Sequence, residues 1–360
     1  MEQFSCKTKI YAGPGSLSVL ATLGCKRLLL VTDPFFHKNG TAQRIAELAK
    51  AEQTEIFHKI VPDPPVELAA EGTALMRSFG PDTLIALGGG SAMDCAKAMA
   101  YFAGIPVTLV AIPTTSGSGS EVTDFAILTH NAVKHPLVDA RIRPDIAILD
   151  SNLLTQLPPA LIADSGFDVL SHALEAYVAK GAGAISDCLA RDAFSAVFAV
   201  LPASFAGNTH VRQKIHTAAT MAGLAFTQAG LGLCHALSHS LGGIFHIPHG
   251  RLNAILLPSV IECNALCAGA KYASLARSAG LGGSADTIAI RNLKNALIRL
   301  RRDLQLPQTL AQAGVDPGQV RFHGAEIVKA ALADPCCASN PLNIEDFMVR
   351  RILEEVMGRV

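Results

Sequence analysis

Four short apolar runs in the first half of the chain each stop at glycine, proline or aspartate. They cover residues 27–32, 83–87, 107–112 and 146–149. Helical patterns lie between them, for example over residues 41–52 and 91–102. Short continuous apolar runs that alternate with helices predict a parallel sheet covered on both faces. Ligands of such sheets bind beyond the carboxyl ends of the strands.

Beyond about residue 154 the strand-like runs are replaced by long helical patterns, such as residues 162–179 and 184–198. We therefore predict an α/β domain over residues 1–154 and an all-α domain over residues 155–360. A ligand-binding cleft is expected between them. Residues 343–360 have the pattern of an amphipathic helix, which we expect to be docked on the second domain.

Composition is that of a well-buried globular protein. Hydrophobic residues make up 50% of the chain and charged residues 17%, and the formal net charge is +0. These values argue against disorder and against nucleic-acid or membrane partners. The first residues lack a secretory signal pattern, and the nine cysteines are scattered and odd in number. Both features predict reduced thiols and a cytoplasmic protein.

Histidines in one short apolar segment are the strongest indication of chemistry. His235 and His239 are four residues apart and would share one face of a helix. His249 follows a Gly-Gly pair and a proline, so the chain can turn back toward that face. Upstream, Asp168 and His172 repeat the same spacing. Each histidine alone is more simply a satisfied core residue, whereas the whole set predicts a metal site.

Neutral imidazoles and a carboxylate suit a divalent transition metal such as iron or zinc. A further histidine, His246, lies in the same segment. Spacing alone therefore leaves open which three histidines bind the metal. Cys234 precedes His235 and would point about 100° away from it on a helix, so we expect it to pack rather than bind.

A glycine turn indicates a nucleotide site at the sheet edge. Gly88, Gly89, Gly90 and Ser91 follow a predicted strand and open a helix, where the backbone can approach a ligand and exposed amides attract phosphate. Asp33 ends the first predicted strand, where a carboxylate accepts ribose hydroxyls and repels a 2′-phosphate, so NAD is favoured over NADP.

A second loop, residues 113–121, supplies hydroxyl and amide donors at the end of the third predicted strand. It contains Thr114 and Thr115. Taken alone, Asp33 is explained as a turn aspartate before Pro34, and residues 113–121 are explained as a polar loop. Their coincidence at one sheet edge favours a ligand.

Taken together, these segments resemble the iron-dependent (group III) alcohol dehydrogenase family. The likeness runs through residues 11–15, 88–94, 113–123, 166–177 and 230–258. It implies an α/β dinucleotide-binding domain with a parallel sheet and an all-α metal-binding domain, the fold shared with dehydroquinate synthase. It also implies that Fe(II), with zinc as an alternative, is held by Asp168, His172, His235 and His249.

The resemblance also implies positions for NAD and for catalysis. The cofactor positions are Asp33, Asp63, Gly88, Gly89, Gly90, Ser91, Thr114, Thr115 and Lys134. His239 becomes a catalytic residue near the nicotinamide, with proton relay as its expected role. The implied reaction is reversible reduction of a short aldehyde, similar to propanal, to its primary alcohol, with the metal polarising the carbonyl oxygen.

Within the family, residues 4–11, 228–233 and 330–334 resemble those of a microcompartment-associated branch, which implies microcompartment enzymes or a shell as further partners. The family resemblance as a whole implies a homodimer. Phe167, Leu170 and Phe245 are expected to shape an apolar aldehyde pocket.

Other functions stay open. One is an ethanol or lactaldehyde (1,2-diol) oxidoreductase of the same family. Another is a metal- and NAD-dependent lyase, which would need several basic residues around a phosphorylated substrate; Arg251 follows His249 without such a cluster. The third is a non-catalytic microcompartment component, which predicts eroded ligands or a broken glycine turn, and the sequence has neither.

Overall fold

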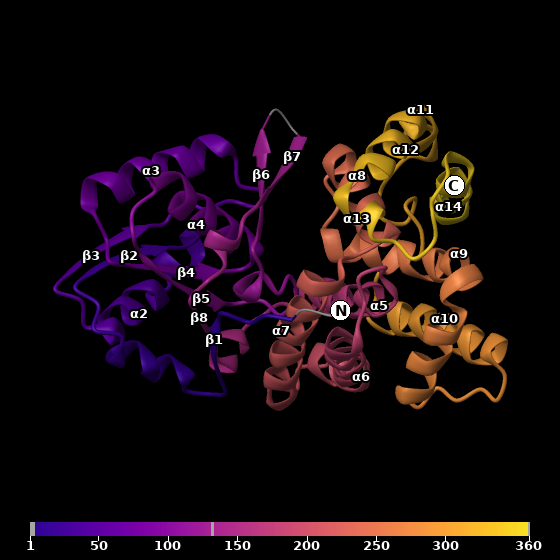
Figure 1. Ribbon diagram of the computed structural model, residues 1–360, viewed down its shortest axis with the longest axis horizontal. Coiled ribbons are helices and arrows are strands. Elements are labelled where there is room, and N and C mark those ends of the chain that lie inside the picture. Colours follow the sequence, from indigo (N-terminus) through magenta and orange to yellow (C-terminus); the bar gives the residue numbers. More distant parts are fainter. Residues whose placement is uncertain (1–3, 131–132, 359–360) are drawn as a thin grey trace. The chain divides into compact units, whose positions relative to one another are not determined.

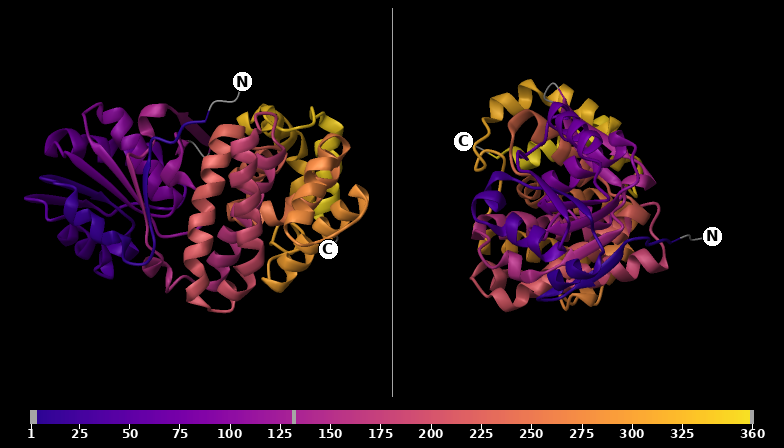
Figure 2. Two further views of the ribbon diagram at one scale, coloured as in Figure 1. Left: turned by 60° about the horizontal axis from the view of Figure 1, so that its bottom comes forward. Right: turned by 90° about the vertical axis from the view of Figure 1, so that its left-hand side faces the viewer.

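The computed structural model describes residues 4–130 and 133–358, which form two compact units (Figure 1). One unit is Ser5–Leu157, and the other consists of the described residues from Pro158 onward together with Phe4. The first contains a parallel sheet flanked by helices. The second consists of helices from α5 onward, which the left view of Figure 2 shows in magenta to yellow. The predicted fold class is confirmed.

The first unit is built on one six-stranded sheet. Its strands stand in the order β1-β8-β5-β4-β2-β3, and every neighbouring pair is parallel. A separate antiparallel hairpin is formed by β6 and β7. The strands are β1 (Lys9–Ala12), β2 (Arg27–Val31), β3 (Gln53–Phe57), β4 (Thr83–Gly88), β5 (Thr108–Pro113), β6 (Phe125–His130), β7 (Val133–Val138) and β8 (Ile146–Leu149). The helices are α1 (Pro34–Lys38), α2 (Thr41–Ala49), α3 (Val66–Phe79) and α4 (Gly90–Ala103).

Both faces of the sheet are covered because its central strands are apolar on each face. Leu29 and Leu84 belong to a core cluster with residues of α3 and α4. Leu28 and Ile85 belong to a cluster with α2 and the 3₁₀ helix Ser16–Thr22. Each such side chain contributes about 1.5–3 kcal/mol when fully buried, so the two clusters hold the layers together.

One predicted helix was too long. The pattern over residues 41–52 predicted continuous helix, but α2 ends at Ala49, where Lys50 takes a left-handed backbone (φ 53°). The chain then forms β3, which pairs with β2 from Arg27↔Gln53 onward. Most of β3 is polar and exposed because it lies at the edge of the sheet, so no apolar run marked it.

The second unit is a helical assembly around α5. Residues 166–179 of this region are buried on all sides, with α6, α7 and α9 packed against α5. The helices are α5 (Pro159–Val178), α6 (Ala184–Phe205), α7 (Arg212–Ala229), α8 (Leu233–Phe245), α9 (His249–Ser278), α10 (Asp286–Asp303), α11 (Pro317–Phe322), α12 (Gly324–Ala333), α13 (Pro335–Ala338) and α14 (Asp346–Met357). The predicted C-terminal helix is therefore α14, and its apolar face is buried.

Length and composition alone would let α6 and α9 cross a membrane. Both pack against other helices of the same unit: α6 lies on α5 and α7, and α9 lies on α5, α8 and α10. The core helices of many proteins without a membrane span have the same length and composition.

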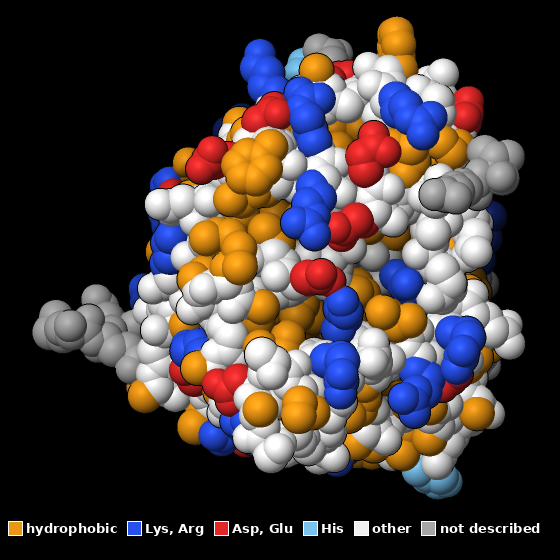
Figure 3. Space-filling view, turned by 90° about the vertical axis from the view of Figure 1, so that its right-hand side faces the viewer, with side chains coloured by type: hydrophobic (Ala, Val, Ile, Leu, Met, Phe, Trp, Pro, Cys, Tyr) orange, Lys and Arg blue, Asp and Glu red, His pale blue; other side chains and the backbone are white. Residues whose placement is uncertain are grey.

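The outward face of the helical unit carries mixed charge. Figure 3 shows Lys and Arg interspersed with Asp and Glu, with hydrophobic side chains between them. Ion pairs such as Lys294–Glu262 (2.5 Å) and Arg351–Glu355 (3.0 Å) lie on α9, α10 and α14. Among the described residues of this face, basic and acidic side chains are therefore mixed rather than separated by sign.

Candidate metal and cofactor sites

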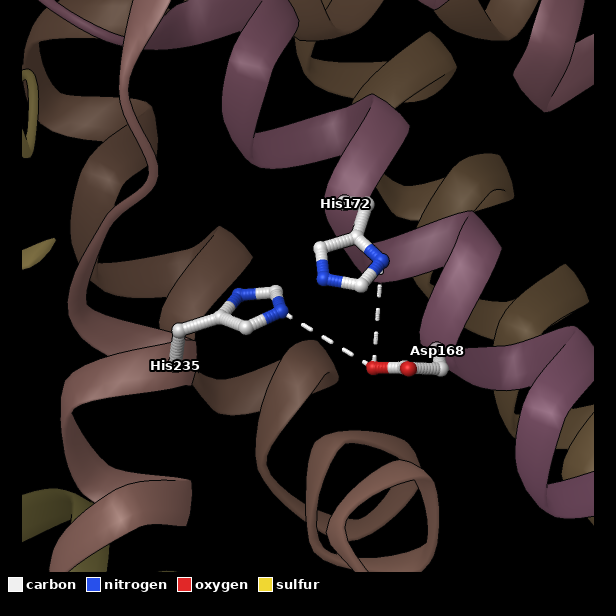
Figure 4. A group of neighbouring side chains, drawn as sticks. All are labelled: Asp168, His172 and His235. Carbon is white, nitrogen blue, oxygen red and sulfur yellow. Dashed lines mark ion pairs between the residues drawn. The ribbon is translucent and has the colours of Figure 1, made fainter. Parts of the chain in front are cut away.

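Three predicted histidine ligands converge on a carboxylate oxygen of the fourth, Asp168, in the helical unit. Asp168 and His172 lie one turn apart on α5, His235 lies on α8, and His249 begins α9. Oδ1 of Asp168 is 3.9 Å from Nδ1 of His172, 3.9 Å from Nε2 of His235 and 3.6 Å from Nε2 of His249. Figure 4 shows the first three side chains pointing toward one another from two helices. The donors predicted from sequence are thus brought together.

The spacing and chemistry of these donors fit a divalent transition metal. Such ions hold imidazole nitrogens and carboxylate oxygens at about 2.0–2.2 Å, so donors around one ion lie roughly 3.4 Å apart. The separations of 3.6 to 3.9 Å are close to that value. Nδ1 of His172 is buried and has no hydrogen-bond partner among the described residues. A metal would satisfy this nitrogen and neutralise the buried carboxylate.

Burial sets the protonation preferences of this cluster. It raises the pKa of Asp168, against the opposing effect of His172 and the hydrogen bond from Asn253. It lowers the pKa of His235 well below the usual range, helped by repulsion from His172. Neutral imidazole is the form that binds a metal, so burial favours the ligand state of His235.

Two buried partners of the ligands were missed by the sequence prediction. Nδ2 of Asn253, on α9, donates to Oδ1 of Asp168 at 2.9 Å. Glu175, on α5, lies 2.6 Å from Nδ1 of His235 and accepts backbone N–H groups at the start of α8. Glu175 follows Asp168 by seven residues and so shares its helix face. That spacing is the one signal that could have identified it.

His239 lies beside the ligand cluster but makes a different contact. Its ring stacks on that of His249 at a centroid distance of 5.2 Å, and its Nδ1 is 2.8 Å from Oδ2 of Asp334. Burial pushes the pKa of Asp334 up, but the hydrogen bonds from His239 and from the N–H of Cys336 outweigh it, so the pKa is lowered. Asp334 was also missed, because 95 residues separate it from His239.

Three other sequence expectations are decided by the structure. His246 is exposed and ends α8 with a left-handed backbone (φ 54°), so it is not part of the cluster. Phe167 and Leu170 are fully buried in the core, so they do not line the apolar aldehyde pocket expected of them, whereas Phe245 is half-buried and its role in such a pocket stays a prediction. Arg251 forms a bidentate ion pair with Asp164: Nε donates to Oδ1 at 3.1 Å and Nη2 donates to Oδ2 at 2.9 Å. Its guanidinium is therefore already engaged.

The predicted cofactor residues around the glycine turn, Asp33 and the loop after β5 lie at the carboxyl end of the sheet. Strands β2, β4 and β5 are neighbours, so the residues after their carboxyl ends lie side by side. The N–H of Thr114 donates to the carbonyl of Gly88 at 2.9 Å. A Cβ added at Gly89 would lie 3.2 Å from Oγ1 of Thr115. Because Gly89 has no side chain, Thr115 can pack directly against the glycine turn at the start of α4, the helix that Gly90 and Ser91 begin.

Asp33 lies at the same carboxyl end of the sheet, just after β2. Its Oδ1 accepts the N–H groups of Phe35 and Phe36 and so caps α1. Its Oδ2 faces the glycine turn, 3.9 Å from where a Cβ of Gly88 would stand. One oxygen therefore serves the fold while the other is directed toward the predicted nucleotide site.

Asp63 and Lys134 are brought together by the hairpin. Nζ of Lys134, on β7, lies 2.8 Å from Oδ1 of Asp63, which has a left-handed backbone (φ 51°). The two predicted positions are thus partners of one another.

A buried polar network ties the glycine-turn helix to the loop after β5. Nζ of Lys97, on α4, donates to Oγ of Ser120 at 2.9 Å and to Oγ1 of Thr123 at 3.0 Å. Ser120 donates in turn to Asp94 at 3.0 Å. Burial lowers the pKa of Lys97 to about 8 and raises that of Asp94 to about 6. The network was not predicted, and it orients the two backbone segments that carry the predicted cofactor residues.

Comparison with known proteins covers both units. The family profile described as iron-containing alcohol dehydrogenase matches residues 7–151, and that of the Fe-containing alcohol dehydrogenase family, C-terminal, matches residues 162–357. The 1-propanol dehydrogenase PduQ of Citrobacter freundii is 40% identical, over 99% of this chain and 100% of its own. The NADPH-dependent butanol dehydrogenase of Clostridium saccharobutylicum is 35% identical, over 98% and 97%.

A solved structure is similarly close. Sulfoacetaldehyde reductase from Bifidobacterium kashiwanohense, in complex with NAD+, superposes with a TM-score of 0.90 at 28% identity, covering 99% of this chain and 98% of that one. The converging Asp and His donors fit the iron-containing class of oxidoreductase that both family profiles describe. The chain belongs to the iron-containing alcohol dehydrogenase family.

Proposed function

We propose that this protein is an NAD(H)- and iron-dependent alcohol dehydrogenase that reversibly reduces a short-chain aldehyde, such as propanal, to the primary alcohol. The observation that carries the proposal is the convergence of His172, His235 and His249 on Oδ1 of Asp168. The relatives that act on propanol and butanol support a small, uncharged substrate. The proposal assigns NAD binding to residues 1–154 and metal binding to residues 155–360.

The helical unit contributes the metal ligands. Asp168, His172, His235 and His249 would hold Fe(II), or zinc in its place. When bound, the metal supplies Lewis-acid stabilisation of the charge that develops on the substrate oxygen. Asn253 keeps the ligating oxygen of Asp168 oriented through its 2.9 Å hydrogen bond.

The α/β unit contributes the cofactor contacts. Gly88, Gly89 and Gly90 leave the space for a pyrophosphate at the start of α4, where Ser91 and the free N–H groups attract negative charge. Thr114 and Thr115 line the neighbouring loop, and Asp63 and Lys134 stand as a pair on the hairpin side. The free oxygen of Asp33 accepts ribose hydroxyls and disfavours a 2′-phosphate, which supports NAD over the NADPH of the butanol dehydrogenase. The reduced cofactor, NADH, would supply the hydride for aldehyde reduction.

His239 is the residue we assign to proton transfer. It is partly exposed, lies against His249 and has its Nδ1 hydrogen-bonded to Asp334. The alcohol oxygen must gain a proton during aldehyde reduction, and an imidazole next to the ligand cluster can deliver it. The lyase alternative is weakened because Arg251 is paired with Asp164.

The test begins with protein purified anaerobically, whose metal content and NADH oxidation with propanal are measured in one sample before and after chelation. We expect stoichiometric iron, and activity that chelation removes and Fe(II) restores. Bound metal and NADH without turnover of any short aldehyde would contradict the dehydrogenase. Faster turnover of a phosphorylated or anionic aldehyde would contradict the substrate class.

Assembly and location belong to the same proposal. We propose a homodimer in the cytoplasm, with association into a microcompartment supported by the resemblance to PduQ. Sedimentation of the purified protein, and its co-fractionation with shell proteins, test these two points separately.

A further inference from the structure

We infer that Glu175 is the positioning residue of the metal centre: it selects the nitrogen through which His235 binds the metal and holds the two ligand-bearing helices α5 and α8 in register. The inference rests on the proposed metal-dependent function. It concerns a residue that is not itself a ligand, because its carboxylate faces the far side of the His235 ring.

The carboxylate of Glu175 is fully engaged by donors. Oε2 lies 2.6 Å from Nδ1 of His235 and accepts the N–H of Gly232 at 2.9 Å. Oε1 accepts the N–H of Cys234 at 2.6 Å. The side chain of Glu175 is 1% exposed, as is that of His235. In this dry environment each donor needs its acceptor.

These contacts determine the tautomer of His235. Both oxygens of Glu175 accept N–H groups, so the ring nitrogen that faces them must carry a proton. Nε2 is then left with its lone pair, and it points toward Oδ1 of Asp168 at 3.9 Å. The N–H of Asn253, 3.4 Å from the same nitrogen, also requires a lone pair there. A carboxylate that binds the far nitrogen of a metal-ligating histidine fixes its orientation and raises its basicity.

The same carboxylate connects two helices. Glu175 lies on the buried face of α5 with Asp168 and His172, and its backbone partners are at the start of α8. It therefore caps α8 and at the same time fixes the distance between the ligands of α5 and the ligand of α8. Gly232 allows this close approach, because a Cβ there would lie 2.8 Å from Oε1 of Glu175.

An isosteric amide cannot replace this carboxylate. In Glu175→Gln, an NH2 group placed at the Oε2 position would face the N–H of Gly232 and force the proton of His235 onto Nε2. An NH2 group placed at the Oε1 position would face the N–H of Cys234. Either orientation sets a donor against a donor, and the negative charge behind His235 is lost in both.

The experiment measures metal affinity directly. Metal-free parent, Glu175→Gln and Asp187→Asn proteins are titrated with Zn²⁺ against a chromophoric chelator, and with Co²⁺ while its visible absorption is recorded. Asp187→Asn is the matched control, because it makes the same change in an ion pair with Lys271 in the same unit, away from the ligands. We expect Glu175→Gln to bind zinc roughly 10–100-fold more weakly, with an altered cobalt spectrum, and the control to bind like the parent.

Several outcomes would overturn the inference or the function beneath it. Parent-like zinc affinity in folded Glu175→Gln overturns the role of Glu175, while a parent protein that binds no metal overturns the proposed function instead. Circular dichroism of the metal-free proteins and NAD binding establish that the variants are folded. If Glu175→Gln does not fold, Glu175→Asp, which keeps the charge but is one methylene shorter, takes its place: at least tenfold weaker binding supports the role, and unchanged binding overturns it.

Discussion

Oδ2 of Asp334 lies 2.8 Å from Nδ1 of His239, and Oδ1 of the same carboxylate accepts the N–H of Cys336 at 2.8 Å. Asp334 therefore holds His239 with its Nδ1 protonated and its Nε2 free to exchange a proton. We predict that Asp334→Asn lowers kcat for propanal reduction roughly 100-fold, the scale of a general acid–base contribution, because the amide favours the other tautomer. The KM for NADH should change little. Steady-state kinetics with a solvent isotope effect measure both.

Asp316→Asn is the control for that variant. Asp316 also caps a short helix that begins with proline, and its side chain accepts the N–H of Gly318 at 2.9 Å. Asp316→Asn makes the same carboxylate-to-amide change at a helix cap without touching a histidine. Equal losses of activity in the two variants would show that Asp334 matters only for the fold.

Removal of the metal should destabilise the helical unit. A ligand that binds only the folded state at 100 times its Kd stabilises that state by about 2.7 kcal/mol. For a unit of this size, chelation should lower its unfolding temperature by about 5–10 °C. Scanning calorimetry with and without chelator measures the shift. In Asp168→Asn, which lacks the central ligand, the shift should vanish, and a shift of parental size would count against the site.

Gly89→Ala should weaken NAD binding. The added methyl group would lie 3.2 Å from Oγ1 of Thr115, so it would push apart the glycine turn and the loop that we assign to the cofactor. We expect the Kd for NADH to rise about tenfold or more, equivalent to at least about 1.4 kcal/mol. Fluorescence titration measures it. Gly269→Ala, where the methyl group meets Ile290 at an ordinary 3.5 Å, should bind NADH like the parent.

Asp33→Asn should relax the choice of nucleotide. The amide oxygen can still cap α1 through the N–H groups of Phe35 and Phe36, so stability should be nearly unchanged. Loss of the negative charge removes repulsion of a 2′-phosphate. We expect the ratio of kcat/KM for NADPH to that for NADH to rise roughly tenfold, since one charge contact near a surface is worth about 1–4 kcal/mol. An unchanged ratio would mean that Asp33 does not face the ribose.

Arg301 should compensate for the backbone hydrogen bond that Pro258 cannot make within α9. Pro258 has no N–H, so it cannot donate to the carbonyl of Ala254 four residues earlier. Arg301, buried on α10, donates to this carbonyl at 2.9 Å. Arg301→Met should lower the free energy of unfolding by about 2–3 kcal/mol. Pro258→Ala restores the helical donor, so the loss should be smaller in the double variant; equal losses in both backgrounds would exclude this coupling.

Local sequence patterns were sufficient for much of the fold. The four central strands β2, β4, β5 and β8 are short apolar runs, because both of their faces are buried, and a fully buried strand has no alternative to apolar side chains. The edge strand β3 and the hairpin β6–β7 were not predicted. Three of the five residues of β3 are polar and exposed, and their strand conformation depends on pairing with β2.

The sequence by itself determined the chemistry of the candidate site: an Asp and His set at helical spacing, a glycine turn after a strand, and an aspartate at a strand end. These signals are local, since helix periodicity and chain turns act over a few residues. Only the tertiary structure decided which groups hold the ligands in place. Asn253 meets Asp168 and Asp334 meets His239 across 85 and 95 residues. A buried polar group must find its partner wherever packing brings one, and that depends on how the helices assemble rather than on neighbouring residues.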